Sequence, residues 1–124
     1  MIRGVRGATT VPENFEQEIL SATEQLMKEM IAQNKIEPDN VASVFISVTD
    51  DIDAAFPAKA IRSLEGWTFV PVMCMREIPV KDSLTHCIRI MVHVNTYQHQ
   101  KDIQHVYLEE ATCLRPDLKH DDDK

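Results

Sequence analysis

The sequence has 124 residues, of which 44% are hydrophobic and 27% are charged. A chain of this length suits one domain that buries roughly two-thirds of its unfolded surface, so its core needs neither disulfides nor a metal. The formal net charge of −7 argues against nucleic acid and against an anionic membrane as the main partner, because both require a basic protein surface.

The cysteines and the amino-terminal segment indicate the compartment. Cys74, Cys87 and Cys113 form no CxxC pair, and an odd number of widely spaced cysteines favours reduced thiols. The segment MIRGVRGATT lacks the apolar region of a signal peptide, and no stretch approaches the roughly 18 apolar residues of a membrane span. We therefore expect a soluble cytoplasmic protein.

The first part of the chain predicts a strand, a long helix and a second strand. Residues 2–10 form a short strand whose two glycines suggest a close approach of backbone or ligand. Residues 12–35 carry apolar side chains at helical spacing, and Asn34 is the expected end of this helix. The turn signal EPDN then introduces a strand over residues 40–49.

The second part predicts shorter elements. A short helix-like piece follows Pro57 and ends at a glycine. A strand covers residues 69–78, where a proline suggests an edge or bulge position. Another strand covers residues 86–95. Residues 103–118 predict a short strand followed by irregular chain.

The order of these elements predicts an α+β fold, in which one long helix packs on one face of a mixed β-sheet. The sequence contains no internal repeat or low-complexity linker. We assign residues 1–118 to a single domain and residues 119–124 to a polar tail. Since one helix cannot cover both faces of so apolar a sheet, we expect another copy of the chain to cover the second face.

An arginine lies in the middle of the apolar segment HCIRIMVHVN, residues 86–95. Alternation places isoleucines and valines on one face of this strand, and Arg89 on the other face with Cys87, Met91 and His93. Burying an unpaired cation costs several kcal/mol, so Arg89 must lie at a wet edge, pair with a carboxylate or bind an anion.

The sequence gives little indication of metal binding, phosphate-loop binding or nucleophilic catalysis, so the arginines are the main candidate functional residues. The histidines and cysteines lack zinc-ligand spacing, GVRGATT lacks the GK[ST] ending of a phosphate loop, and neither a serine triad nor an activated cysteine is evident. Arg6 and Arg89 both interrupt apolar strands, and the planar fork of arginine suits carboxylates. Glu77 can accept a hydrogen bond from a substrate hydroxyl, and Tyr107 offers a polar tip. The residues alone predict a pocket for a polycarboxylate.

Segments along the whole chain resemble one known family. They are, in order, IRGVRGATTV, AAFPAKAIR, VPVMCMREI, CIRIMVHVNT and HVYLEEATCLRPDL. From Ile2 to Leu118 the chain is similar to the AroH-class chorismate mutases, the monofunctional trimeric bacterial type. The resemblance implies a homotrimer with active sites at subunit interfaces. It also implies rearrangement of chorismate to prephenate, on the shikimate pathway to phenylalanine and tyrosine, without a cofactor.

The resemblance implies a role for each member of a catalytic set. Arg89 is the cation beside the ether oxygen of chorismate, where negative charge develops as the bond breaks. Arg6 holds a substrate carboxylate, and the hydroxyl of Tyr107 joins that contact. Glu77 and the thiol of Cys74 meet the ring hydroxyl.

The resemblance also implies a larger substrate-binding set. It comprises Tyr107, Phe56, Ala58, Lys59, Arg62, Val72, Met73, Met75, Arg76, Leu114 and Arg115, of which the last two belong to a segment that closes over the pocket. In the family, residues 56–77 come from one subunit, whereas Arg6, Arg89, Tyr107 and the carboxyl-terminal segment come from its neighbour.

Two alternatives belong to other classes. The first is a non-catalytic trimeric binder of small carboxylates, which would not need a cation at the ether oxygen. The second is an enzyme of the trimeric deaminase-like fold acting on imines, which would share an interfacial site but not this residue set. Neither explains Arg89 as well as the mutase does.

Overall fold

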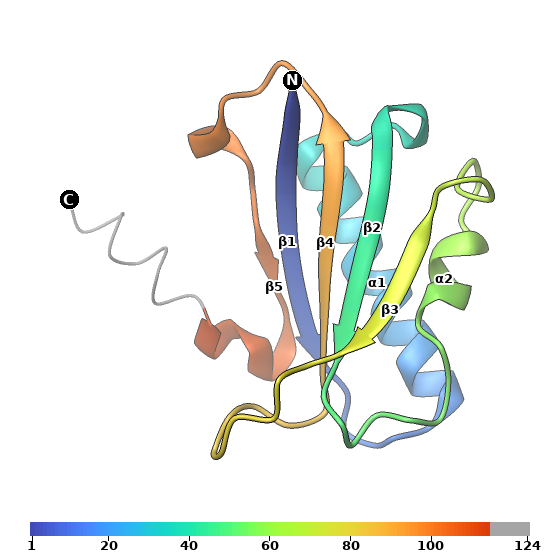
Figure 1. The fold of residues 1–124 in the computed structure, drawn as a ribbon, viewed down its shortest axis with the longest axis vertical. Coiled ribbons are helices and arrows are strands. Elements are labelled where there is room, and N and C mark those ends of the chain that lie inside the picture. The colour runs from blue at the N-terminus through green and yellow to red at the C-terminus, as the bar shows by residue number, and fades with distance from the viewer. Residues whose placement is uncertain (115–124) are drawn as a thin grey trace.

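Five strands form one mixed sheet in the computed structural model, which describes residues 1–114 (Figure 1). In chain order the strands are β1 (Ile2–Thr10), β2 (Val41–Val48), β3 (Val72–Arg76), β4 (Cys87–Asn95) and β5 (Val106–Tyr107). Their order across the sheet is β3-β2-β4-β1-β5. The central strand β4 is antiparallel to both β1 and β2, whereas the edge strands β3 and β5 run parallel to β2 and β1.

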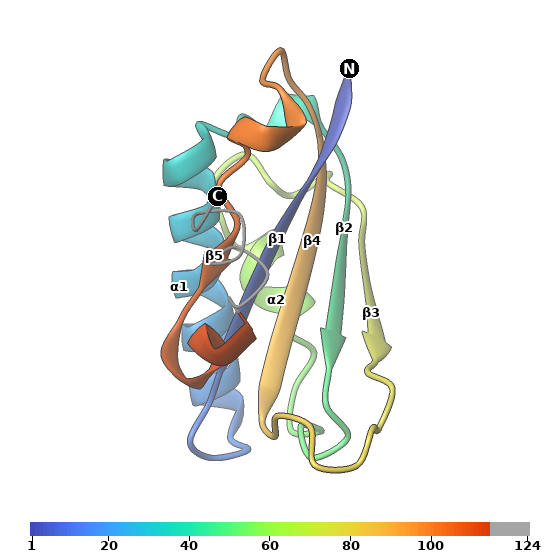
Figure 2. The same cartoon turned by 90° about the vertical axis from the view of Figure 1, so that its left-hand side faces the viewer.

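Two α-helices lie on the same side of this sheet (Figure 2). They are α1 (Glu16–Asn34) and α2 (Ala58–Arg62). The chain also forms three short 3-10 turns, at Pro38–Asn40, Gln100–Asp102 and Glu109–Leu114. Within residues 1–114 neither α-helix packs on the opposite face, which we call the open face. The predicted α+β fold with one long helix on one face is therefore confirmed. None of the described helices has the length and apolar content needed to cross a membrane.

The core lies between α1 and the sheet, where the apolar side of the helix packs against the apolar face of the strands. Leu26, Met27 and Met30 of α1 are fully buried, as are Ile88 and Val92 of β4. Side chains alternate between the faces of a strand, so the intervening residues of β4 are left on the open face. The alternation predicted for residues 86–95 is thus confirmed.

Helix α1 starts later than the sequence predicts. The prediction placed its start near residue 12, but Phe15 is still extended, with φ −121° and ψ 144°. The side chain of Asn14 instead bonds the loop after β2, donating to Asp53 Oδ1 at 2.7 Å and accepting from the N–H groups of Asp53 and Ala54 at 3.1 Å. The tertiary contact therefore outweighs the local helix signal, whereas the predicted end at Asn34 is confirmed.

Strand β3 is shorter than predicted and lies at the edge of the sheet. The prediction covered residues 69–78, but pairing with β2 runs only from Val72 to Arg76. Pro71 cannot donate a backbone hydrogen bond, and its carbonyl accepts the N–H of Val44 at 2.9 Å. The edge position predicted from this proline is confirmed.

Gly7 offers a test of the packing between α1 and β1. A Cβ at Gly7 would overlap Met30 Sδ and lie 3.1 Å from Leu26 Cδ1. We expect Gly7→Ala to lower the free energy of unfolding in urea by about 1–3 kcal/mol, because the added methyl overpacks a filled core. Gly4→Ala is the control, since its Cβ on the exposed side would approach only Met91 Sδ. Equal stability of the two variants at matched protein concentration would contradict this packing.

Candidate active site

An ion pair stands at the centre of the open face. Arg89 Nε of β4 lies 3.0 Å from Glu77 Oε2, and the hydroxyl of Ser47 on β2 donates to the same oxygen at 3.0 Å. Glu77 immediately follows β3, and its N–H bonds the carbonyl of Val48 at 2.8 Å. The side chains of Arg89 and Glu77 are 44% and 28% exposed. The pair is therefore fixed in position yet reachable from solvent.

The strand register places Arg89 in a row that crosses all five strands. Tyr107 pairs with Ala8, Ala8 with Arg89, Arg89 with Ser47, and Ser47 with Met75. Side chains in register on neighbouring strands share one face of a sheet. The small side chain of Ala8 leaves space between the guanidinium of Arg89 and the ring of Tyr107.

A second row on the same face carries the other strand arginine. Arg6 pairs with Met91, Met91 with Phe45, and Phe45 with Met73. Phe45 and Met73 are 41% and 59% exposed. Arg6 thus lies one step diagonally from Arg89, beside an apolar strip that faces solvent.

These two rows border a hollow of about 410 Å³. The predicted site residues that line it are Arg6, Met75, Glu77, Arg89, Tyr107 and Leu114. Two guanidinium groups against one carboxylate give this hollow a positive balance on an acidic chain, which favours a small anion. Arg115, predicted to close the pocket, lies outside the described residues.

A second hollow, of about 560 Å³, lies on the helix side of β3. It contains the predicted residues Phe56, Lys59, Arg62, Cys74, Met75 and Arg76. Cys74 pairs with the buried Ile46 and packs against the core, so it faces away from the open face. Of the remaining predicted residues, the buried Ala58, the half-buried Val72 and the exposed Met73 line neither hollow.

The two hollows divide the predicted residues differently from the sequence-based expectation. That expectation grouped Glu77 with residues 56–76, but Glu77 bonds Arg89 of its own chain. Glu77 and Cys74, predicted as a pair, lie on opposite faces of the sheet. The reason is the alternation of a strand, in which positions three apart point in opposite directions.

The structure adds two polar residues that sequence reasoning missed. Ser47 fixes Glu77, as described above, and the ring Nδ1 of His105 accepts the backbone N–H of Arg6 at 3.0 Å. Alternation within residues 40–49 places Ser47 on the same face as Phe45. The contact of Ser47 with Glu77 could not be found from the sequence, because the pairing of β2 with β3 is not encoded locally.

Cys87 is a buried thiol two residues before Arg89. Burial raises the pKa of Cys87, and the nearby carboxylate of Glu77 adds to this, although the charge of Arg89 acts in the opposite direction. The thiol therefore stays protonated at neutral pH and is a poor nucleophile.

The chain entering β4 is fixed by Asp51. Its carboxylate accepts the N–H of His86 at 3.0 and 3.1 Å and the hydroxyl of Thr49, and Thr49 Oγ1 accepts the N–H of Cys87 at 3.0 Å. Burial alone would raise the pKa of Asp51, but the hydrogen bonds from Thr49 and His86 outweigh it and lower the pKa below 3.8. Asp51 thus holds the start of the strand that carries Arg89.

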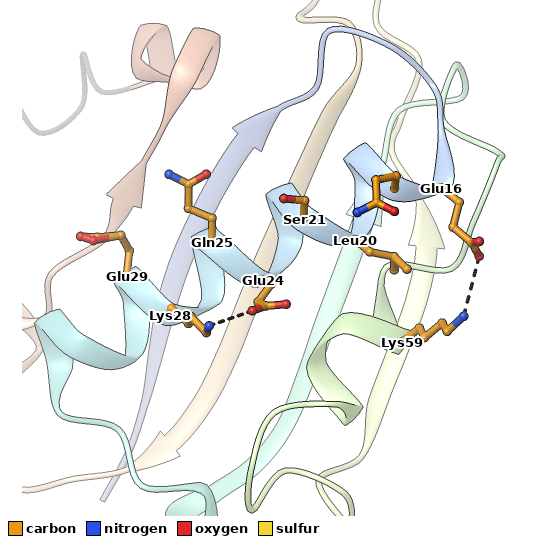
Figure 3. Close-up of a pocket in the computed structure, with 9 residues that line it drawn as sticks. Glu16, Leu20, Ser21, Glu24, Gln25, Lys28, Glu29 and Lys59 are labelled. Carbon is orange, nitrogen blue, oxygen red and sulfur yellow. Dashed lines mark ion pairs between the residues drawn. The ribbon is translucent and has the colours of Figure 1, made fainter.

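A larger hollow, of about 790 Å³, runs along the outer surface of α1 (Figure 3). Four of its five charged side chains form pairs: Lys28 pairs with Glu24 at 2.7 Å, and Lys59 with Glu16 at 3.9 Å. These side chains are well exposed and point into solvent. Exposed pairs of this kind contribute little stability, and this surface is a solvated helix face.

The open face therefore carries a site in which two arginines can bind a small anion. No cysteine thiolate is needed for this binding. Comparison with known proteins specifies the class, because residues 2–118 match the model of the family "Chorismate mutase type I". The chain belongs to this family, which confirms the family predicted from the sequence and favours catalysis over the two alternatives.

Individual members of the family are similar to this chain over nearly its full length. The chain is 51% identical over 118 residues to "Chorismate mutase AroH" of Bacillus subtilis (strain 168), covering 95% of this chain and 93% of the relative. It is 43% identical over 120 residues to the protein of the same name from Thermus thermophilus, covering 96% and 98%. A solved chorismate mutase from Clostridium thermocellum has a TM-score of 0.86 and 51% identity, covering 89% of this chain and 97% of that one.

The lowered pKa of Asp51 predicts a pH-dependent contribution to stability. A carboxylate whose pKa is lower in the folded state stabilises above its unfolded pKa, and this is lost as pH falls through the folded pKa. We expect Asp51→Asn to be less stable than the wild type at pH 7, with a smaller difference at pH 3. Urea unfolding at both pH values measures this.

Asp39→Asn, on the exposed turn Pro38–Asn40, is the matched control and should change little at either pH. A difference for Asp51→Asn that stayed constant between pH 7 and pH 3 would contradict a stabilising role of the charged carboxylate.

Proposed function

We propose that the protein rearranges chorismate to prephenate in the hollow of the open face, with Arg89 as the principal catalytic residue. The observation that carries this proposal is the position of Arg89, which Glu77 fixes in a hollow beside Arg6 and Tyr107. No covalent intermediate, general base or cofactor is required, because the reaction is an intramolecular Claisen rearrangement.

The chemistry explains why a cation suffices. Chorismate carries two carboxylates, a ring hydroxyl and an enolpyruvyl ether. The ether C–O bond breaks while a C–C bond forms, and negative charge develops on the ether oxygen. A fixed cation there stabilises the transition state more than the bound substrate, which is the condition for catalysis. The guanidinium of Arg89 supplies this charge, and its contact with Glu77 fixes its direction in advance.

Neighbouring residues bind the remaining groups of the substrate. Arg6 holds one carboxylate and Tyr107 donates a hydrogen bond to the same group. Glu77 accepts the ring hydroxyl. Within residues 1–114 the hydrogen bond from Ser47 and the ion pair with Arg89 both use Oε2 of Glu77, which leaves Oε1 for that hydroxyl. Holding both ends of chorismate selects the compact conformer in which the reacting carbons meet, and such orientation lowers the barrier further.

The complete site requires a second copy of the chain. Cys74 and the charged wall of Lys59 and Arg62 lie on the helix side of β3, whereas Arg89 lies on the open face. One chain cannot bring both sets around a single substrate. We propose a homotrimer in which the helix-side wall of one subunit, with Phe56 and Cys74, faces the Arg89 hollow of its neighbour.

The apolar strip of the open face supports this assembly. Phe45, Met73 and Met75 are each at least 41% exposed in the single chain, and exposed apolar surface of this kind marks an interaction site. Leu114 lines the same hollow as Arg89. Cys74, Cys87 and Cys113 are free thiols, which suits the reducing cytoplasm in which we place the enzyme.

Removing the charge of Arg89 tests the proposed function. We expect Arg89→Ala to lower kcat by about a hundredfold to a thousandfold, the usual effect of losing one transition-state donor. Turnover is followed by the loss of chorismate absorbance and by acid conversion of prephenate to phenylpyruvate. Lys28→Ala removes a charge from the solvated face of α1 and should leave kcat unchanged. A wild type that binds chorismate without turnover would indicate the non-catalytic binder instead.

Mixed trimers test whether two chains share each site. We expect Arg89→Ala and Arg62→Glu to be inactive alone, because each damages one of the two surfaces. Coexpressed in equal amounts, they should regain activity, since about a quarter of the interfaces in random trimers combine two intact surfaces. Purified mixed trimers without activity would contradict a shared site, as would a monomer by light scattering at micromolar concentration.

A further inference from the structure

His105 makes an unusual contact with the backbone of a proposed substrate-binding residue. The N–H of Arg6 donates to the ring Nδ1 of His105 at 3.0 Å. Strand β5 pairs with β1 only at Gly7 and Ala8, where the N–H of Leu108 bonds the carbonyl of Ala8 at 2.9 Å. The imidazole therefore supplies the acceptor just before the paired region, where the described part of β5 offers no paired residue opposite Arg6.

The direction of this bond fixes the state of the ring. A ring nitrogen accepts a hydrogen bond only when it carries no proton, so His105 must be neutral with its proton on Nε2. Burial lowers the pKa of His105 below 6.5, and the positive charge of Arg6 lowers it further. The half-buried ring is thus held in the form that this contact requires.

Arg6 is held by its backbone in the β1–β4 ladder, and the bond to His105 adds to that support. Its side chain is exposed on the open face, so core packing does not hold it. On one side Arg6 is in register with Met91 of β4, and on the other side its backbone meets His105. Tyr107 lies two residues after His105 and is in register with Ala8. The ring therefore adds one hydrogen bond to the β1–β5 pairing that sets the relative positions of Arg6 and Tyr107.

We propose that His105 is a positioning residue, whose neutral imidazole aligns the guanidinium of Arg6 and the hydroxyl of Tyr107 on one substrate carboxylate. This inference rests on the proposed function, in which Arg6 binds that carboxylate. His105 itself does not line the hollow that contains the two residues. Its effect should therefore appear in substrate binding more than in the chemical step.

A matched series of variants isolates the acceptor. In His105→Asn the side-chain oxygen can occupy the place of Nδ1, whereas His105→Phe keeps a ring but removes the acceptor. We expect His105→Phe to raise KM about fivefold to tenfold, the size of one lost hydrogen bond, with a smaller change in kcat. His105→Asn should restore most of the wild-type KM.

A double-mutant cycle connects the effect to Arg6. We expect His105→Phe to raise KM in the wild type but to add almost nothing in Arg6→Ala, because contacting residues that act through one another are not additive. Circular dichroism and light scattering of every variant check that fold and assembly are retained. The ¹⁵N shifts of the His105 ring should show an unprotonated Nδ1 in the wild type.

The outcomes separate the inference from the proposed function. If Arg6→Ala raises KM but His105→Asn behaves like His105→Phe, or if the two effects simply add, the positioning role is wrong while the proposed function stands. A protonated Nδ1 at neutral pH would also overturn the positioning role. If Arg6→Ala leaves KM unchanged, the carboxylate-binding role of Arg6 fails, and the role of His105 fails with it.

Discussion

The contact between Arg89 and Glu77 is the interaction on which the rest of the site depends. A guanidinium on a sheet face with a large apolar strip is costly once the face is covered, because an unpaired charge loses its hydration. Glu77 offsets this cost, and the hydroxyl of Ser47 fixes the carboxylate in turn. The positive balance left by Arg6 is available for a substrate anion. The same ion pair would thus allow the face to be buried in the proposed assembly, and it holds the guanidinium of Arg89 in place.

The sheet turns this local arrangement into a rigid site. Register across five strands brings together residues from both ends of the chain, such as Ala8 and Tyr107. The opposite face carries the core, so the strands are fixed by packing against the helices α1 and α2 while their other face remains available for binding. Because one face of the sheet is packed and the other binds substrate, the charged groups of the site are held in fixed positions. Fixed dipoles and charges need not reorganise during the reaction, and this lowers its barrier.

Local patterns predicted the elements and the two faces of the central strand, because alternation and helical spacing are properties of neighbouring residues. The sequence also identified Arg89 as anomalous before any pairing was known. The strand order could not be predicted, since pairing joins residues far apart in the chain, and with it the contacts of Ser47 and His105 stayed hidden. Cys74 and Glu77 are three positions apart, so alternation alone places them on opposite faces of one chain.

A comparison of two substitutions at one position tests electrostatic catalysis by Arg89 most directly. Arg89→Lys keeps the positive charge and Arg89→Gln removes it, while both retain hydrogen-bond donors. If charge at the ether oxygen drives the reaction, both variants lose activity, but the lysine variant keeps a kcat about tenfold or more above that of the glutamine variant. Equal kcat values in the two folded trimers would show that the charge of Arg89 is not the source of the acceleration.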